Sequence, residues 1–280
     1  MKKLLALALT LVMALTVFTA CGSKKDDSKA TKAVKEQVET VDTTGVKTLK
    51  DGVLKVGIEI GYPPFETMKK DGKTPEGYDI DIIEAVAERL GLKVEYVNTA
   101  FDGIFDGIDK NYDVVCSAIT INKERKKTML FSDPYITNYQ ALVVKSDDNR
   151  KVKSFKDLAG MKIALQEGTT SKEIMDDLIG TKTIKNTKYI ENEKITGCFD
   201  MLKNGEVEGI LLDSTVADSL VAKDKAFKIA WVDNTEPEEF GIPMGKKNVA
   251  LQKAINAALK DMNAKGIIKD SQEYWFGQDK

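Results

Sequence analysis

The stretch YDVVCSAITINKERKK, Tyr112–Lys127, decides the fold class, because a strand pattern ends there in polar and basic residues. Its first part, YDVVCSAIT, is a short apolar run typical of a buried strand, and Arg125 opens the next helical turn. The same order, a strand and then a helix, recurs on both sides of this stretch. The alternation predicts an α/β fold with mostly parallel sheets.

On the N-terminal side, the alternation begins at residue 53. VLKVGIEIG (53–61) alternates apolar and polar residues and predicts a strand. Residues 79–91 carry one apolar helical face, with Asp79 as a candidate N-cap and Gly91 at the C-terminal end. LKVEYV predicts the next strand and FDGIFDGIDK (101–110) a helix.

On the C-terminal side, the alternation continues over more than a hundred residues. The predicted strands are 141–146, 162–168, 187–191 and 209–214. The predicted helices are 154–160, 169–179, 195–205, one from residue 216, and an amphipathic helix at 251–266. The second half thus repeats the alternation of the first, and 280 residues are enough for two domains of ordinary size.

The first fifty residues have a different character. Residues 1–20 join a short basic start to an apolar run that is too short for an ordinary membrane span. Small residues then precede Cys21, so this segment resembles a bacterial lipoprotein signal peptide with Cys21 as the lipidated residue. An ordinary secretory signal with an incidental cysteine is the alternative. Residues 21–50 are rich in Lys, Asp and Thr and predict a flexible tether. If the signal peptide is of the lipoprotein type, the protein works outside the cytoplasm and is held to the membrane by a lipid anchor.

Composition excludes several kinds of function. The chain has a net charge of −2 with a small acidic excess in 51–280, which argues against nucleic acid as a partner. It contains no histidine, the usual general base and neutral metal ligand. Cys116 and Cys198 fit no zinc motif; they either pair or stay as thiols, with Cys116 buried in a strand. We expect neither a metal nor a cofactor.

The candidate ligand-binding residues follow from one topological rule. Ligands of open α/β sheets bind at the C-terminal ends of the strands. The residues at or after predicted strand ends are Glu59, Tyr62, Phe101, Ser117, Ala118, Thr120, Arg125, Gln166, Gly168, Thr169, Thr170 and Asp213.

These residue types suit a zwitterion. Arg125 can hold a carboxylate by two parallel hydrogen bonds, assisted by hydroxyls and backbone N–H groups at 169–171. Asp213 and Thr120 can accept from an ammonium group, and Tyr62 and Phe101 offer aromatic faces. For Phe101 a place in the core, and for Asp213 a helix cap, remain the alternatives.

Six blocks in one order carry a family resemblance. They are GYPPFE (61–66), EGYDIDI (76–82), AFDGIFDGI (100–108), AITINKERKKTMLFSDPY (118–135), LQEGTTS (165–171) and LLD (211–213). Together they resemble the amino-acid-binding branch of bacterial extracellular solute-binding proteins, the receptor subunits of ABC importers. The resemblance covers essentially all of 51–280.

The resemblance implies both architecture and roles. It implies a two-lobed periplasmic-binding-protein-like fold with a two-strand hinge, lobe 1 being 51–138 plus 240–280 and lobe 2 being 139–239. It implies that Arg125 and Thr170 bind the ligand α-carboxylate, and that Asp213 takes the α-ammonium. The ammonium also meets Thr120 and the backbone of Ala118, while Tyr62 and Phe101 stack on the side chain. The implied partners are a free amino acid and the importer permease.

The ligand and the rival functions stay open at this point. Glu59 beside Tyr62 favours a basic amino acid, but it can also bind an amide or a water, so polar ligands remain. An extracellular dehydratase of cyclohexadienyl acids resembles this fold, and an anchored sensor or adhesin is a third possibility. Without a histidine we expect no enzyme, and we expect a monomer.

Overall fold

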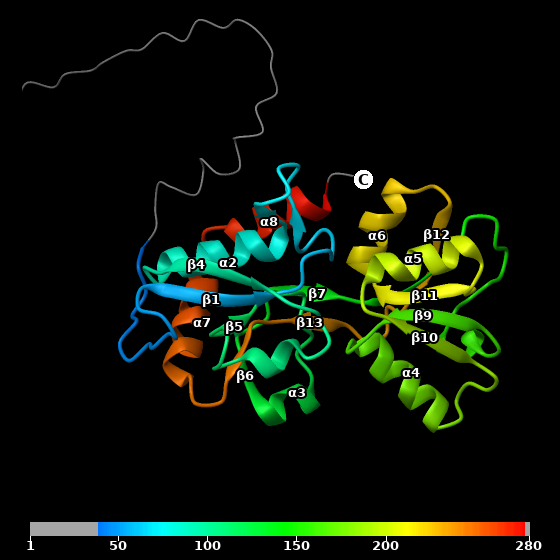
Figure 1. Cartoon of the computed structure of the whole chain (residues 1–280), viewed down its shortest axis with the longest axis horizontal. Coiled ribbons are helices and arrows are strands. Elements are labelled where there is room, and N and C mark those ends of the chain that lie inside the picture. The colour runs from blue at the N-terminus through cyan, green and yellow to red at the C-terminus, as the bar shows by residue number, and fades with distance from the viewer. Residues whose placement is uncertain (1–38, 278–280) are drawn as a thin grey trace, which may run out of the picture. The chain divides into compact units, whose positions relative to one another are not determined.

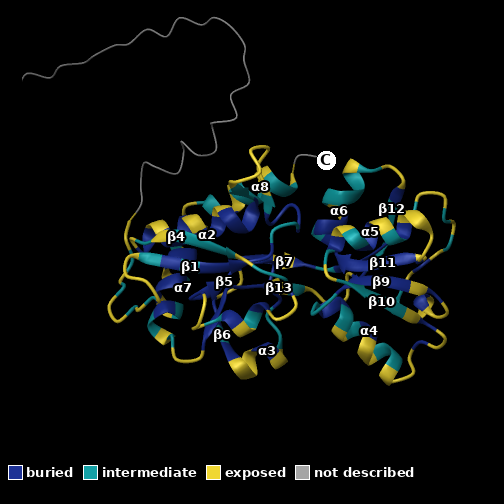
Figure 2. Ribbon diagram, viewed as in Figure 1, coloured by how far each residue is buried: buried dark blue, intermediate teal, exposed yellow. Residues whose placement is uncertain are grey.

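The computed structural model describes residues 39–277, which lie within the compact unit Gln37–Lys280. Two five-stranded sheets organise these residues (Figure 1). The central strands of both sheets are largely buried, several edge strands are of intermediate exposure, and most exposed residues lie on the helices and loops (Figure 2). The α/β class and the two-lobed arrangement predicted from the sequence are confirmed.

The first sheet has the order β4-β1-β5-β14-β6. β1 is parallel to both β4 and β5, whereas β14 is antiparallel to β5 and β6. We call this sheet and its helices the first lobe. Its strands are β1 (Val53–Ile58), β4 (Lys93–Asn98), β5 (Val114–Val115), β6 (Met129–Phe131) and β14 (Pro243–Gly245); its helices are α2 (Tyr78–Arg89), α3 (Lys123–Thr128), α7 (Val249–Ala264) and α8 (Ile267–Phe276).

The second sheet repeats this plan in the order β10-β9-β11-β8-β12. β9 is parallel to β10 and β11, and β8 is antiparallel to β11 and β12. We call this sheet and its helices the second lobe. Its strands are β8 (Gln140–Lys145), β9 (Lys162–Gln166), β10 (Lys188–Asn192), β11 (Gly209–Asp213) and β12 (Phe227–Val232); its helices are α4 (Thr170–Gly180), α5 (Ile195–Asn204) and α6 (Ser214–Lys223).

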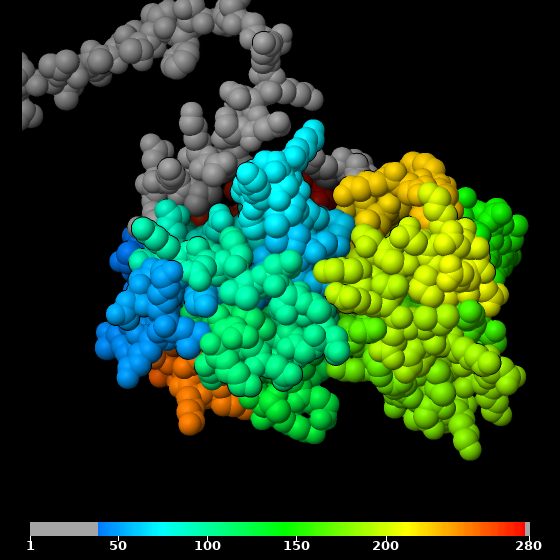
Figure 3. Space-filling view, viewed as in Figure 1, coloured from blue at the N-terminus to red at the C-terminus, as the bar shows by residue number. Residues whose placement is uncertain are grey.

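Two strands run between the sheets. β7 (Ile136–Asn138) and β13 (Glu238–Phe240) pair antiparallel and join the lobes, as Figure 1 shows. In the space-filling view, the residues of the first lobe meet the yellow-green residues of the second (Figure 3). These crossing strands are therefore the covalent connections about which the lobes can move.

Several elements differ from the sequence-based expectation. The helix predicted at 101–110 is only the 3₁₀ turn η1 (Ile104–Gly107), because Gly103 and Asp109 have φ of 78° and 63°. The helix predicted at 154–160 is likewise a 3₁₀ turn, η2 (Phe155–Leu158), and a short hairpin, β2 (Thr67–Met68) with β3 (Pro75–Glu76), was not predicted. Neither was α8, which packs on α2 and α7.

The start of α2 depends on a glycine rather than on an acidic cap. Gly77 is the N-cap, with φ of 145°, and a Cβ there would overlap the carbonyl oxygen of Phe65. Glycine is needed at such a close approach. The prediction that Asp79 caps this helix is wrong, since Asp79 lies inside the first turn and is fully buried.

The N-terminal part of the described chain lies against the first lobe. Val41 and Val46 pack on the core, and the Leu49 N–H donates to Asp113 at 2.6 Å, although we expected these residues to belong to the tether. Cys21 and the predicted signal peptide lie outside the described residues. In the part described, Cys116 and Cys198 are buried free thiols, and no helix has the length and apolar character of a membrane span.

Candidate functional site

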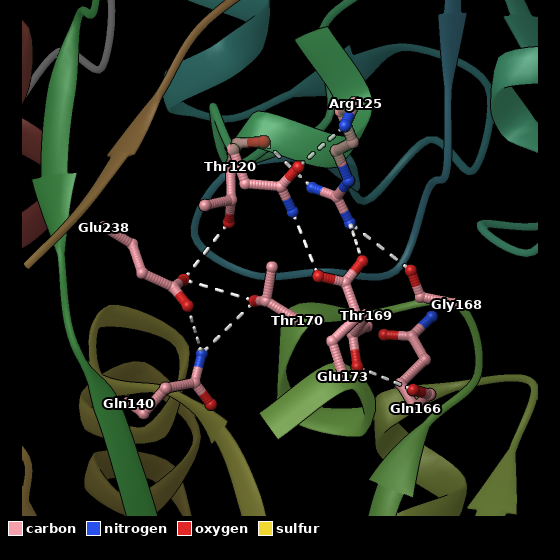
Figure 4. Close-up of polar contacts among 10 residues, drawn as sticks. Thr120, Arg125, Gln140, Gln166, Gly168, Thr169, Thr170, Glu173 and Glu238 are labelled. Atoms are coloured by element: carbon pink, nitrogen blue, oxygen red, sulfur yellow. Dashed lines mark hydrogen bonds and ion pairs between the residues drawn. The ribbon is translucent and has the colours of Figure 1, made fainter. Parts of the chain in front are cut away.

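Most of the predicted residues come together where the two lobes touch. Strand ends of β1 and β5 and the start of α3 supply them from the first lobe, and those of β9 and β11 from the second. Each of these ends is the C-terminal end of a strand in a parallel part of its sheet, so both sheets direct loops toward the other lobe. Figure 4 shows one part of this contact, around Arg125 and Thr170.

Arg125 is buried at this contact, with 7% of its surface exposed. The Asn122 side chain caps α3 by accepting from the Arg125 N–H at 2.8 Å, which fixes the start of that short helix. The guanidinium donates to the carbonyl oxygens of Thr120 at 3.0 Å and of Gly168 at 3.4 Å, and it lies 5.1 Å from the Phe105 ring centroid. Arg125 therefore points inward, as predicted, whereas Lys123 beside it is exposed.

The charge of Arg125 has no close carboxylate partner among the described residues. Glu173, half-exposed on α4, is the only ion-pair partner there, at 4.0 Å from Nη2. Burial lowers the pKa of Arg125, and the negative charges of Glu173, Glu238 and Asp213 oppose that shift. We call Thr120, Arg125, Gly168 and Glu173 the Arg125 end of the site; it combines a fixed guanidinium with backbone acceptors.

Asp213 lies at the end of β11, and its carboxylate accepts several hydrogen bonds. Its carboxylate accepts from the Tyr62 hydroxyl at 2.5 Å, from Asn138 at 2.7 Å and from Gln140 at 3.2 Å. The bond from Tyr62 joins the two lobes. Burial and the nearby Glu238 raise the pKa of Asp213 to about 7, although its hydrogen bonds and Arg125 favour the charged form. Its side chain does not cap α6, which excludes that alternative.

Glu238 on the crossing strand β13 was missed by the sequence analysis. It accepts from the hydroxyls of Thr120 at 3.1 Å and Thr170 at 3.3 Å and from the Gln140 amide at 3.2 Å (Figure 4). Burial raises its pKa. Only its place on a hinge strand pointed to it, because nothing in the local sequence shows that β13 passes beside Thr170.

A cavity of about 720 Å³ opens on the hinge side of these threonines. Thr120 and Thr170 line it, but Arg125 and Asp213 do not. All of the charged residues that line it are acidic: Glu173, Asp177, Asp233, Glu236, Glu238 and Glu239. The lobe contact therefore closes over Arg125 and Asp213, whereas Thr120 and Thr170 border the open space.

A second group of polar contacts surrounds Glu59, which is 2% exposed after β1. Its oxygens accept from the Gln166 amide at 2.7 Å and from the Lys194 ammonium at 3.0 Å, both in the second lobe. Burial raises the pKa of Glu59, while Lys194 and Gln166 lower it. We call Glu59, Gln166 and Lys194 the Glu59 end. Sequence analysis missed Lys194, which lies in a loop with no distinctive pattern.

Two buried acids, Glu66 and Asp79, accept hydrogen bonds from the segment Ser117–Ala118. Ser117 donates to Glu66 at 2.6 Å, and the Ala118 N–H donates to Asp79 at 2.6 Å, holding Ala118 at φ of 51°. Burial raises the pKa of Glu66 well above its usual range and that of Asp79 to about 7. Ser117 therefore turns its hydroxyl toward this support, and Ala118 is fixed through its backbone.

Phe101 and Thr169 lie beside these contacts rather than within them. Phe101 packs in a core cluster with Ile104 and Tyr112, which is the place that the alternative gave it. The ring that meets Arg125 is that of Phe105. The Thr169 hydroxyl donates to the Gln166 carbonyl at 2.7 Å, which shapes the loop before α4. In residues 39–277, no group of three or more Cys, Asp or Glu is placed to hold a metal ion.

Comparison with known proteins covers nearly all of the described chain. A family model described as bacterial extracellular solute-binding proteins, family 3, matches residues 54–278. ABC transporter arginine-binding protein 1 of Escherichia coli (strain K12) is 30% identical over 80% of this chain and 91% of that protein. L-cystine-binding protein TcyJ of the same strain is 32% identical over 83% of this chain and 86% of that protein.

A solved structure shows the same arrangement. An ancestral arginine-binding protein bound to arginine is 36% identical and superposes with a TM-score of 0.75. The alignment covers 80% of this chain and 98% of that one. These proteins are named for different amino acids, so the likeness fixes the kind of ligand more closely than its identity.

Proposed function

The chain belongs to family 3 of the bacterial extracellular solute-binding proteins, and from that premise we propose that it binds one free polar or basic amino acid between its lobes. It acts outside the cytoplasm as an amino-acid-binding protein of an ABC importer. It delivers the bound amino acid to the importer permease, without chemical conversion.

One observation carries the proposal: a buried guanidinium with no carboxylate at hydrogen-bonding distance among the described residues. Arg125 is held by two backbone carbonyls, and its one ion-pair partner there is 4.0 Å away. Its remaining N–H donors suit a ligand carboxylate, which binds a guanidinium through two parallel bonds. Thr170 at the start of α4 adds a backbone N–H to the same anion, and its hydroxyl, which donates to Glu238 in this structure, would turn to the ligand.

We assign the ammonium of the ligand to the carboxylate of Asp213. Asp213 is buried, and its pKa of about 7 leaves it ready to ionise beside a cation. Thr120 and the Ala118 carbonyl complete the acceptors, and the aromatic ring of Tyr62 lies against the ligand. Because Arg125 and Asp213 come from different lobes, a zwitterion that bridges them stabilises the closed form, and the permease recognises that form.

Three further features belong to the proposal. Lobe 1 comprises 51–138 and 240–280 and lobe 2 comprises 139–239, so the crossing strands act as the hinge. Cys21 carries the lipid that anchors the protein to the cell membrane, since a multi-chain anchor gives stable attachment. The protein works as a monomer.

The test is thermal melting of residues 22–280, which contain the whole compact unit, against the twenty amino acids with ornithine and cystine. A ligand that binds only the folded protein raises the melting temperature by mass action. We expect a rise of several degrees for a small set of polar or basic amino acids. Mass spectrometry of the denatured sample first excludes a ligand carried over from expression.

The absence of any shift would contradict the proposal. The dehydratase alternative has its own readout, the turnover of a cyclohexadienyl acid, and we expect none.

A further inference from the structure

The carboxylate of Glu59 is already paired across the lobe contact. One of its oxygens accepts from Lys194 Nζ at 3.0 Å and the other from Gln166 Nε2 at 2.7 Å. Lys194 Nζ also approaches the Ile60 carbonyl oxygen at 3.4 Å. Both oxygens of a carboxylate that the sequence alone would assign to a cationic ligand are thus engaged by the second lobe.

Hydrogen bonds of the backbone hold Lys194 where its side chain can reach Glu59. It is the residue before α5, and its N–H donates to the Asn192 side chain at 3.0 Å. Its carbonyl oxygen accepts from the Gly197 N–H at 3.0 Å, so the backbone on both sides of Lys194 is fixed. Its side chain is 38% exposed, against 2% for Glu59, and therefore reaches from the surface to a buried anion.

This pairing changes what the Glu59 end attracts. An unpaired buried carboxylate would draw a guanidinium or ammonium strongly, because little water screens it. A carboxylate bound to an ammonium presents nearly no net charge to a third group. A cationic side chain brought here would also approach the ammonium of Lys194 and be repelled by it.

The amide of Gln166 points to the chemistry that does fit. Gln166 is 2% exposed, and its Nε2 donates to Glu59 and to the Glu193 carbonyl oxygen at 3.0 Å. Its amide oxygen is buried, and no group in residues 39–277 donates to it. Buried acceptors almost always have a donor partner. A ligand with an uncharged N–H donor on its side chain would supply one.

We infer that Lys194 is the residue that sets side-chain selectivity, and that the ligand is an amino acid with an uncharged, hydrogen-bonding side chain such as a carboxamide. The inference rests on the proposed function and narrows it. Lys194 neutralises Glu59 and repels cationic side chains, while the Gln166 oxygen accepts from the ligand.

The experiment is titration calorimetry of residues 22–280 with L-glutamine, L-asparagine and L-arginine. We expect the wild type to bind glutamine or asparagine more tightly than arginine. In Lys194→Met, which keeps the aliphatic length and removes the charge, arginine should gain at least about tenfold in affinity relative to the neutral ligand. Lys194→Arg, which keeps the charge, should retain the wild-type preference.

Lys188→Met is the matched control, because Lys188 is an exposed residue at the start of β10 in the same lobe. Its affinity ratio should stay within about twofold of the wild type. A wild type that prefers arginine would overturn the inference and leave the receptor intact, and this result needs no variant. So would a Lys194→Met protein, folded by its melting curve, with an unchanged ratio. A wild type that binds no amino acid would overturn the proposed function and this inference with it.

Discussion

The Arg125 end and the Glu59 end of the site are both built around a buried charge, but they treat that charge differently. The Arg125 guanidinium donates to backbone carbonyls and has its nearest ion-pair partner among the described residues at 4.0 Å. The Glu59 carboxylate has an ammonium at 3.0 Å and an amide at 2.7 Å. One end keeps its charge available, and the other closes it into a pair.

The difference shows how one cleft can recognise a constant part and a variable part of its ligand. A carboxylate is common to all free amino acids, so the charge that binds it is best left without a tight partner inside the protein. At the side-chain end, a pair across the lobes removes a preference that a lone carboxylate would impose. Pairing inside the protein therefore sets selectivity as much as the charged residues themselves do.

The largest expected effect comes from removing the available charge. Arg125→Ala should weaken amino-acid binding by at least about a hundredfold, or about 3 kcal/mol, because it leaves the ligand carboxylate buried without its partner. Arg125→Lys keeps the charge but loses the fork of parallel donors, so we expect an intermediate loss. Titration calorimetry with the best ligand from the melting screen measures both.

Lys123→Ala on the same helix is the control, since Lys123 is exposed and should change affinity less than about twofold. Should Arg125→Ala bind as tightly as the wild type, the carboxylate would have to bind elsewhere. The comparison between the two ends would then lose its basis.

The sequence was sufficient to predict the residues that follow strands, but it was insufficient to predict the residues that pair with them across the lobe contact. Arg125 and Asp213 were predicted because each follows a recognisable strand, and the ends of parallel strands meet at one edge of a sheet. Lys194 and Glu238 were missed because their partners lie in the other lobe or beside a crossing strand. Such contacts depend on how the lobes meet, which no local periodicity records.

The secondary structure shows the same distinction between what the sequence predicts and what it does not. Long periodic elements, such as the helix predicted at 251–266 and observed as α7, were placed within about two residues. The stretch 101–110 was predicted to be a helix from its spacing, but two positive φ values limit it to a 3₁₀ turn. Asp79 looked like a cap because it precedes an apolar run, yet Gly77 takes that position and leaves Asp79 to hold Ala118.

A pH titration separates the ammonium-binding group from the pair at Glu59. The pKa of Asp213 is raised to about 7, mainly by burial and then by Glu238. A ligand ammonium needs the charged form, so below pH 7 binding must first displace a proton. We expect affinity to fall roughly tenfold from pH 8 to pH 6, as measured by calorimetry in buffers of different ionisation enthalpy, which also count the released proton.

Two variants assign that dependence. Asp213→Asn should bind more weakly at pH 8 and lose most of the change with pH, because the titrating carboxyl is gone. Glu59→Gln should keep the change with pH, since Asp213 is intact. The opposite pattern would mean that Glu59 is the titrating group and that its pairing with Lys194 does not hold it charged.

The smallest expected effect tests whether the charge of Arg125 is as available as the geometry indicates. Glu173 is half-exposed and lies 4.0 Å from the guanidinium, so it competes weakly with a ligand carboxylate. Glu173→Gln removes that competition while its amide oxygen can still accept from the Asn122 side chain, which now donates to it at 3.0 Å. We expect a two- to threefold gain in affinity by calorimetry, no more, because water screens an exposed charge.

Glu124→Gln on α3, an exposed acid paired with Lys127, should leave affinity unchanged. A tenfold gain in Glu173→Gln would instead show that Glu173 and Arg125 form a real pair. The two ends would then be alike, because at each of them the second lobe would supply the partner of a first-lobe charge.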